Sequence, residues 1–352
     1  MTKRTITFVA LLLILYACKT EEEKPGTRTY RMGFQNSSPH LTFEEAIKTL
    51  NMWIPRADAA IIATDVPWDS LFEGKKAEQY VVNQFQGLVN GYRSKNLELW
   101  VYIEPANGLN RSSESPALIK RGKSMTETDV QDYYKRFAFV MDSVLHPEHM
   151  GLVLETNLIR GLAPESLYNA IKGAANDAAA EIRAYDSGVK LSVGVQVDWA
   201  WGRISSTPQS YQGVAQDFID FPFMEELGLS SYPYFGFNNP ADIPFDYYSK
   251  LVDGKDLPVY IYEGGWSSVT VGDFTGSEQK QADYFVRQRE LLDHAKAIAL
   301  FQLTFTDADV SSFPGAPENL QLFSHLGLVD VNLEAKPALE KWDEIFKLKR
   351  VE

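Results

Sequence analysis

The sequence predicts a single (β/α)8 barrel because short apolar segments alternate with amphipathic helical patterns along the chain. Eight such segments predict strands at 30–35, 59–64, 97–104, 150–156, 189–198, 227–234, 257–263 and 297–305. Strands that alternate with helices form parallel sheets, and eight of them in 352 residues favour a closed barrel over an open doubly wound sheet. No GxGxxG motif follows an early strand, which argues against a dinucleotide-binding fold.

The helical patterns between these strands carry apolar residues at spacings of three and four. Thr42 with Glu45 three residues later forms a capping box, which marks the start of the first helix. Further helices are expected within 77–95, 128–145, 165–185 and 277–296. We find no linker after residue 30, so one domain is expected over 30–352.

The N-terminus predicts export rather than a part of the fold. Lys3 and Arg4 precede an apolar stretch that ends at Cys18, so residues 1–17 are expected to form a signal peptide. Leu15 to Cys18 resembles a bacterial lipobox, and Cys18 is the only cysteine, so we expect it to be lipidated. An ordinary secretory signal with an incidental cysteine is the alternative. Residues 18–29 are expected to be a flexible tether on a protein anchored to the bacterial cell envelope.

Composition narrows the chemistry of the site. The formal net charge of −13 argues against nucleic acid as a partner. Only His40 of the five histidines lies near a strand end, and the pair His146 and His149 is expected on the opposite surface, so we expect neither a metal nor a cofactor. A GxSxG nucleophile elbow is absent. Carboxylate chemistry is what remains.

Carboxylates, amides and aromatic rings follow the predicted strands, where a barrel of this type places its active site. Glu155 and Glu263 end the fourth and seventh strands, and strand alternation predicts that they point inward above Val153 and Ile261. A pair of carboxyl groups facing each other suits glycoside hydrolysis. The other candidate substrate-binding residues are Asn36, Asp65, Trp68, Glu104, Asn157, Gln196, Asp198, Trp199, Tyr234 and Trp266.

Two of these strands resemble a known family. GLSSYPY at 228–234 and PVYIYEGGW at 258–266 look like the sixth and seventh strands of the arabinogalactan endo-β-1,4-galactanase group of clan A glycoside hydrolases. The segment 327–342 is similar to the closing segment of that clan. The resemblance implies that Glu263 is the nucleophile and that Tyr232 orients it. Clan members usually carry Asn before the acid/base glutamate, whereas Leu154 precedes Glu155 here.

Because of this departure, Glu104 and Asp198 remain alternative proton donors to Glu155. The expected function is a retaining glycoside hydrolase, acting as a monomer on an extracellular β-linked polysaccharide or oligosaccharide. The alternative is a lipid-anchored carbohydrate-binding barrel without catalysis. A barrel aldolase or lyase is disfavoured because no lysine ends any of the eight apolar segments.

Overall fold

The computed structural model describes residues 26–40, 42–204, 209–313, 315 and 317–351. The predicted signal peptide at 1–17 and the lipidated Cys18 lie outside these residues. None of the helices in the described ranges combines the length and apolar character that a bilayer crossing requires.

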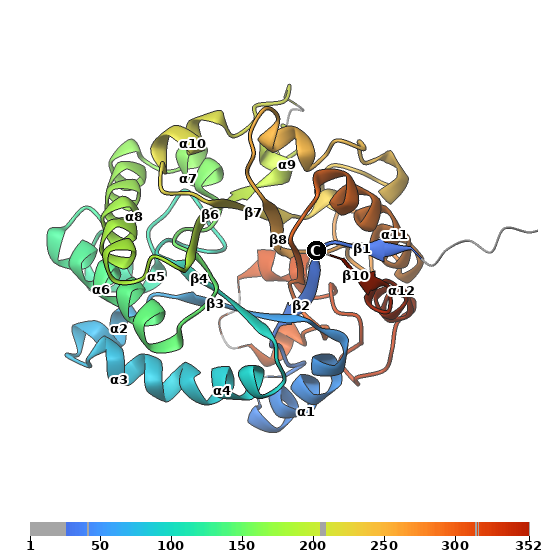
Figure 1. Cartoon of the computed structure of the whole chain (residues 1–352), viewed down its shortest axis with the longest axis horizontal. Helices are drawn as coiled ribbons and strands as arrows, with labels where there is room; N and C mark the ends of the chain where they lie inside the picture. The colour runs from blue at the N-terminus through green and yellow to red at the C-terminus, as the bar shows by residue number, and fades with distance from the viewer. Residues whose placement is uncertain (1–25, 41, 205–208, 314, 316, 352) are drawn as a thin grey trace, which may run out of the picture.

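Eight parallel strands close into a barrel in sequence order, which confirms the predicted (β/α)8 fold (Figure 1). Each strand pairs with its neighbour along the chain, and β2 pairs with β9 to close the ring. The strands are β2 (Arg31–Gln35), β3 (Ala59–Asp65), β4 (Glu98–Glu104), β5 (His149–Gly151), β6 (Lys190–Gln196), β7 (Glu226–Ser231), β8 (Val259–Gly264) and β9 (Ala299–Gln302).

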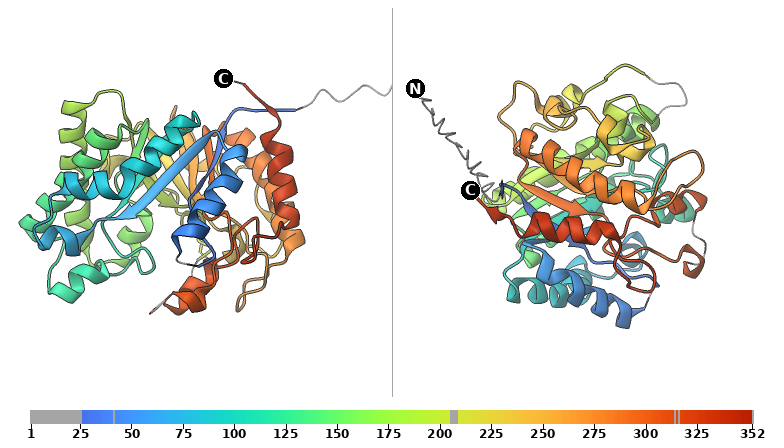
Figure 2. Two further views of the ribbon diagram at one scale, coloured as in Figure 1. Left: turned by 90° about the horizontal axis from the view of Figure 1, so that it is seen from below. Right: turned by 90° about the vertical axis from the view of Figure 1, so that its right-hand side faces the viewer.

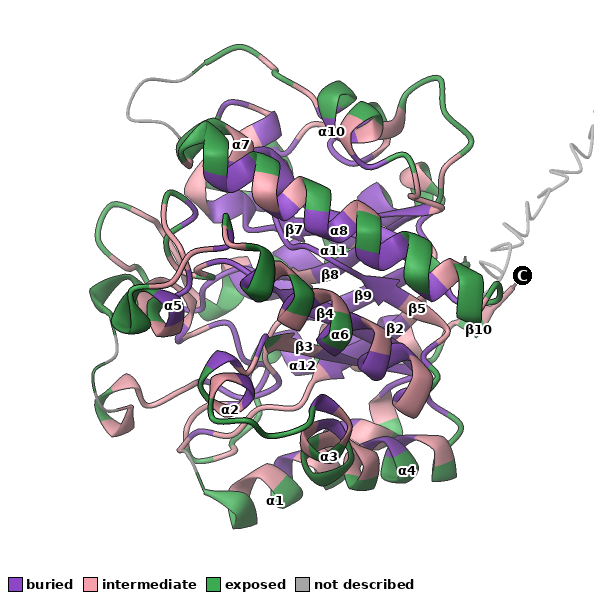
Figure 3. Cartoon of the chain, turned by 90° about the vertical axis from the view of Figure 1, so that its left-hand side faces the viewer, coloured by how far each residue is buried: buried purple, intermediate pink, exposed green. Residues whose placement is uncertain are grey.

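Helices form a layer around the barrel, with their buried faces toward the strands and their exposed faces outward (Figure 3). They are α1 (Phe43–Trp53), α2 (Trp68–Phe72), α3 (Ala77–Val81), α4 (Gly87–Ser94), α5 (Pro116–Arg121), α6 (Thr128–Leu145), α7 (Thr156–Leu162), α8 (Glu165–Tyr185), α9 (Val197–Ala200), α10 (Ala215–Asp220), α11 (Glu278–Ala295) and α12 (Pro337–Phe346). The capping box is present, since the Thr42 side chain accepts a hydrogen bond from the Glu45 backbone N–H.

A small parallel sheet outside the barrel joins the two ends of the described chain (Figures 1 and 2). β1 (Thr27–Arg28) pairs with β10 (Lys349–Arg350), and Arg28 is buried in an ion pair of 2.6 Å with Asp58. The expectation of a tether extending to residue 29 is therefore wrong at its C-terminal end. Backbone pairing with β10, near the C-terminal end of the sequence, orders Thr27 and Arg28, although their polar sequence suggested an unstructured tether.

The fourth predicted strand is much shorter than its apolar pattern suggests. β5 ends at Gly151, the chain then leaves the sheet, and Glu155 adopts a left-handed backbone with φ of 48° directly before α7. The sequence analysis did not anticipate α7. Glu155 is aimed by this turn and not by strand alternation.

Strand alternation in β8 also differs from the prediction. Val259 and Ile261 pack in the core that contains the helix layer, whereas Tyr260 and Tyr262 belong to the cluster that fills the barrel. The expectation that Ile261 lies below Glu263 on one face is wrong. Ser230 of β7 pairs with Glu263 directly after Leu229 pairs with Ile261, so Tyr262 is the extra residue of a bulge. Such a bulge changes the facing of the residues after it.

His149 lies inside the amino-terminal end of the barrel, not on the surface as expected. It stacks on Trp100 with ring centroids 3.8 Å apart. Its Nδ1 lies 2.8 Å from a Glu226 carboxylate oxygen and its Nε2 lies 3.1 Å from Glu98. These carboxylates raise the pKa of His149 against the opposing effect of burial. The residue closes the floor of the barrel far from the strand ends that carry the other candidates.

Candidate active site

The two predicted catalytic carboxylates meet at the carboxyl-terminal mouth of the barrel. Ser230 Oγ donates a hydrogen bond of 2.7 Å to Glu155 Oε1, and the Ser230 backbone pairs with Glu263 across β7 and β8. Ser230 therefore brings the two glutamates together, and the Glu155 carboxylate raises the pKa of Glu263. Two neighbouring carboxyls roughly 5 Å apart are the arrangement that retaining glycosidases use.

Arg111 links the predicted acid/base to a second glutamate. Its Nε donates a bond of 2.7 Å to Glu155 Oε2, and its Nη1 forms an ion pair with Glu104 Oε2. The other Glu104 oxygen accepts the backbone N–H of Ala106 at 2.7 Å. All three charged side chains are buried, so Arg111 compensates two carboxylates at once. Sequence reasoning missed Arg111 because it lies in the loop after β4 and not at a strand end.

Burial and the neighbouring Glu155 carboxylate raise the pKa of Glu263 to about 8, against the opposing effects of Arg111 and Ser230. Burial likewise raises the pKa of Glu104, and Arg111 opposes this rise. At neutral pH this shift favours the protonated form of Glu263. Ser230 donates its single hydrogen to Glu155.

Tyr232 follows β7 and lies near both glutamates. Burial and then the Glu263 and Glu155 carboxylates raise its pKa. Its backbone N–H donates a bond of 2.8 Å to Asp198, whose other oxygen accepts the Tyr247 hydroxyl. Asp198 is fully buried and holds the Tyr232 backbone in place. Of the three candidate proton donors, Glu155 alone lines a cavity at the barrel mouth, because neither Glu104 nor Asp198 borders either of the two cavities there.

The two candidate amide side chains, Asn157 after β5 and Gln196 at the end of β6, have different surroundings. Asn157 Nδ2 donates a hydrogen bond of 2.9 Å to the Gln196 backbone oxygen, and Asn157 Oδ1 accepts one of 2.8 Å from the Gln196 backbone N–H. It is buried and ties two strand ends together, which contradicts a role in holding a sugar. Gln196 lies at the edge of a cavity, and its side chain accepts the N–H of Trp199 at 2.6 Å.

The aromatic candidates separate in the same way. Trp68 and Trp266 are 1% and 0% exposed, so neither presents a ring face to a ligand. Tyr234 is 2% exposed and donates 2.7 Å to the Leu322 backbone oxygen. The expectation that these three stack on a sugar is wrong, because each ring packs into the layer behind the strand ends. Trp199 does line a cavity.

Two cavities lie at this end of the barrel, and one of them borders a catalytic candidate. One of about 350 Å³ is lined by Glu155, Arg111, Gln196, Trp199 and Tyr232 together with apolar side chains, and we call it the Glu155 cavity. The other, of about 340 Å³, is lined by Asn36 and further polar residues that follow β2 and β9. Phe323 lines both, so the 3-10 helix η7 (Glu318–Phe323) lies between them. Asp65 lies at the end of β3 with its side chain exposed and lines neither cavity.

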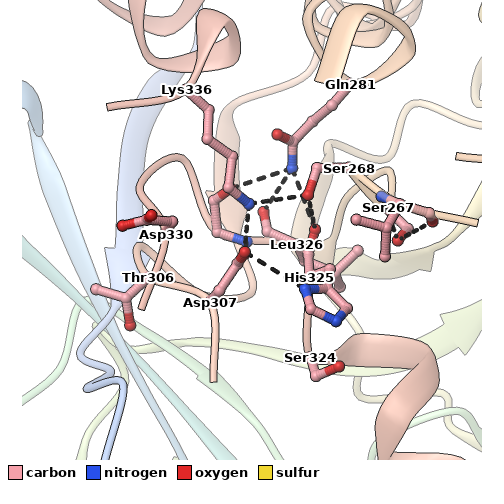
Figure 4. A network of polar contacts seen from close by, with 12 residues as sticks. Ser267, Ser268, Gln281, Thr306, Asp307, Ser324, His325, Leu326, Asp330 and Lys336 are labelled. Atoms are coloured by element: carbon pink, nitrogen blue, oxygen red, sulfur yellow. Dashed lines mark hydrogen bonds and ion pairs between the residues drawn. The ribbon is translucent and has the colours of Figure 1, made fainter. Parts of the chain in front are cut away.

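A buried lysine supports the loops behind this mouth (Figure 4). Lys336 Nζ donates to Asp307 Oδ1 at 2.5 Å, to Ser268 Oγ at 3.0 Å and to the Gly327 backbone oxygen at 2.9 Å. These contacts join the segment after β8 to the segment after β9. His325 approaches Asp307 at 3.5 Å at the edge of this network.

No three histidine, cysteine or acidic side chains come together as a possible metal site in the part of the chain that the structure describes. Neither a scan of protein-family models nor a search of curated proteins found a match to the sequence.

Solved structures with a similar fold are glycoside hydrolases by description. A family 39 glycoside hydrolase from Bacteroides cellulosilyticus WH2 matches with a TM-score of 0.59 and 15% identity, over 91% of this chain and 64% of its own, slightly under two thirds. Xylanase 10B from Thermotoga maritima matches with a TM-score of 0.60 and 13% identity, over 91% and 95%. The β-D-glucuronidase of Dictyoglomus thermophilum matches with a TM-score of 0.60 and 13% identity, over 94% and 52%. At these identities the likeness establishes the barrel fold, and function has to be argued from the site.

Proposed function

We propose that this chain is a retaining β-glycosidase in which Glu155 and Glu263 form the catalytic pair. One observation supports this most directly: Ser230 bonds the Glu155 carboxyl through its hydroxyl and pairs with Glu263 through its backbone, so both glutamates meet at the barrel mouth beside a cavity. The solved structures of similar fold, whose descriptions name a xylanase and a glucuronidase, are consistent with a carbohydrate substrate.

The proton must move before the reaction starts. A nucleophile at Glu263 has to be ionised, whereas burial and the Glu155 carboxylate raise its pKa and favour its protonated form. The pair therefore reacts from the form in which the shared proton lies on Glu155 and Glu263 is ionised, which is the state that the reaction requires.

The chemical steps then follow from geometry. A Glu263 oxygen attacks the anomeric carbon as the glycosidic bond breaks, and Glu155 gives its proton to the departing oxygen. A glycosyl ester on Glu263 remains. Glu155, now a carboxylate, removes a proton from water, which attacks the anomeric carbon and releases Glu263. Arg111 keeps the Glu155 carboxylate in place between the two steps.

A trapping experiment tests the assignment. Incubation with 2-deoxy-2-fluoro-β-glycosyl fluorides should leave a covalent sugar on the peptide that contains Glu263, detected by mass spectrometry. Glu263→Gln should abolish both labelling and the release of reducing ends from β-glycans. A label on Glu155 would reverse the roles of the pair.

The second candidate function is a carbohydrate-binding barrel without catalysis, and Arg111 is the observation that favours it. A permanent ion pair between Arg111 and Glu155 would prevent proton donation to a leaving group. Saturable binding of a β-glycan without new reducing ends would support this candidate over the hydrolase.

The cellular location is part of the proposal and depends on Cys18 alone. We propose a lipid-anchored, monomeric protein of the bacterial cell envelope. Metabolic labelling with an alkyne fatty acid should mark the wild-type chain and not Cys18→Ala. Labelling of neither form would favour a signal without a lipid anchor.

A further inference from the structure

The Glu155 cavity is bounded away from its carboxylate by large apolar side chains. Phe235, Phe274, Phe323, Leu109, Leu158 and Leu322 all line it. Each of the six is only partly buried in the folded chain. A volume of about 350 Å³ bordered by this many half-exposed apolar groups suits an apolar occupant.

A second sugar unit is a poor occupant for this wall. Aliphatic leucine side chains offer no donor or acceptor, so hydroxyl groups held against them lose hydrogen bonds to water without replacement. Leu109, Leu158 and Leu322 lie on three different segments: the loop after β4, helix α7 and helix η7. The apolar wall therefore comes from three separate segments and not from one residue, and it faces the polar part of the lining that includes Arg111 and Gln196.

Helix η7, which lines the cavity, is held by two hydrogen bonds. Asn319 Nδ2 donates 2.8 Å to the Leu109 backbone oxygen, which joins helix η7 to the loop after β4. The Tyr234 hydroxyl fixes the same helix through the Leu322 backbone oxygen at 2.7 Å. A helix held at two points between the two cavities limits the length of a bound chain.

The contacts of the cavity indicate which part of a substrate it holds. Glu155 borders it and Glu263 does not. Because Glu155 is the proposed proton donor to the departing group, the cavity lies on the side of the leaving group. The cavity after β2 and β9 borders neither glutamate, and its lining mixes polar residues such as Asn36 with apolar residues such as Phe313.

From these contacts we infer that the substrate is a short β-glycoside whose leaving group is apolar, such as an alkyl or aryl alcohol, and not a second sugar. The inference rests on the proposed hydrolase function for the direction of the bond. It names the leaving group, which the carboxylate pair alone does not specify.

The test compares leaving groups on one sugar. Octyl and methyl β-D-glycosides of glucose, galactose, mannose, xylose and glucuronic acid are hydrolysed in parallel with the β-1,4 disaccharide of each sugar. Octanol and methanol are chemically similar leaving groups, so the ratio of kcat/KM for the octyl glycoside to that for the methyl glycoside reports contacts between the protein and the octyl group. We expect octyl to exceed methyl at least tenfold and to exceed the disaccharide, since each buried methylene contributes about fourfold to binding.

Matched variants connect the preference to the cavity. Phe274→Ser removes one ring of the wall and should lower the octyl-to-methyl ratio about five- to tenfold. Phe43→Ser removes a ring that is 82% exposed on α1 and should leave the ratio unchanged. Calorimetric titration of wild type with octyl and methyl glycosides should show a negative heat-capacity change for octyl alone.

The outcomes separate the two proposals. Hydrolysis of the disaccharide at or above the octyl rate overturns the apolar leaving group and leaves the hydrolase function standing. If no glycoside is turned over, the hydrolase function fails. In that case, octyl binding that Phe274→Ser abolishes still supports an apolar cavity, and the absence of octyl binding overturns it.

Discussion

Replacing Arg111 with Met should destabilise the fold strongly, because it leaves two buried carboxylates without their cation. Glu104 and Glu155 are 4% and 7% exposed, and Arg111 is 5% exposed. Removing one partner of a buried ion pair typically costs 3–5 kcal/mol. In a chain of 352 residues a loss of about 4 kcal/mol lowers Tm by roughly 5 °C.

The loss should depend on pH in a defined direction. Arg111 opposes the rise in the pKa of Glu104 that burial causes, so its removal raises the folded-state pKa of Glu104 further above the unfolded value of 4.5. A carboxyl with a raised folded-state pKa destabilises the protein increasingly as pH rises from the unfolded value through the folded one. The difference in the free energy of unfolding between wild type and Arg111→Met should therefore be largest at pH 8 and much smaller at pH 4.5.

Urea unfolding followed by tryptophan fluorescence at both pH values measures this difference, and 7 tryptophans supply the signal. The double variant Glu104→Gln with Arg111→Met should recover part of the loss, since one of the two uncompensated charges is gone. A loss below about 1 kcal/mol at pH 8, or one that is equal at both pH values, would refute the role assigned to Arg111.

Four further predictions follow from other buried polar groups. Ser230→Ala should lower kcat about 10- to 100-fold, while Ser230→Thr, which keeps the hydroxyl, should retain most of the rate. Because the glutamate pair shares one proton that Glu155 must donate, kcat/KM should fall as pH rises through about 8, and a rise there would refute the shared proton. Burial raises the pKa of Asp142 from 3.8 to about 7, so Asp142→Asn should stabilise the fold by about 2–4 kcal/mol above pH 7 and not at pH 4, measured by urea unfolding. Lys336→Met should cost about 3–5 kcal/mol in thermal unfolding, and adding Asp307→Leu should restore part of it.

The architecture was predictable from the sequence because the strands of a parallel barrel are short, continuous apolar segments that can be recognised in the sequence. All eight predicted strands are present, and β3 and β4 differ from their predicted bounds by one residue. The location of Glu155 and Glu263 at the mouth followed from the same pattern, because parallel strands share one carboxyl-terminal face. These predictions depended on the periodicity of apolar residues, which is informative wherever the backbone is a regular strand or helix.

Periodicity fails where the backbone is irregular, and the site lies in such places. The bulge at Tyr262 turns Glu263 inward although its neighbours alternate the other way. The left-handed backbone at Glu155 is set by a turn that no apolar pattern encodes. Arg111 reaches the carboxylates from a loop, and a loop arginine carries no signal of its target. Trp266 follows a strand end as predicted, yet packs into the core because tertiary contacts decide which ring faces outward.

The proton on Glu263 has its origin in the packing of the barrel interior beneath it. Tyr262 stacks on Tyr102 with ring centroids 4.4 Å apart, and the two rings fill the space under the carboxylates. They fit because Gly194 and Gly228 leave room: a Cβ at either position would collide with Tyr262 or Tyr102. Burial is the main cause of the raised pKa of Glu263, and the aromatic floor contributes to it by excluding water from below. Two glycines on β6 and β7 thus contribute, through two tyrosines, to where the proton rests in the catalytic pair.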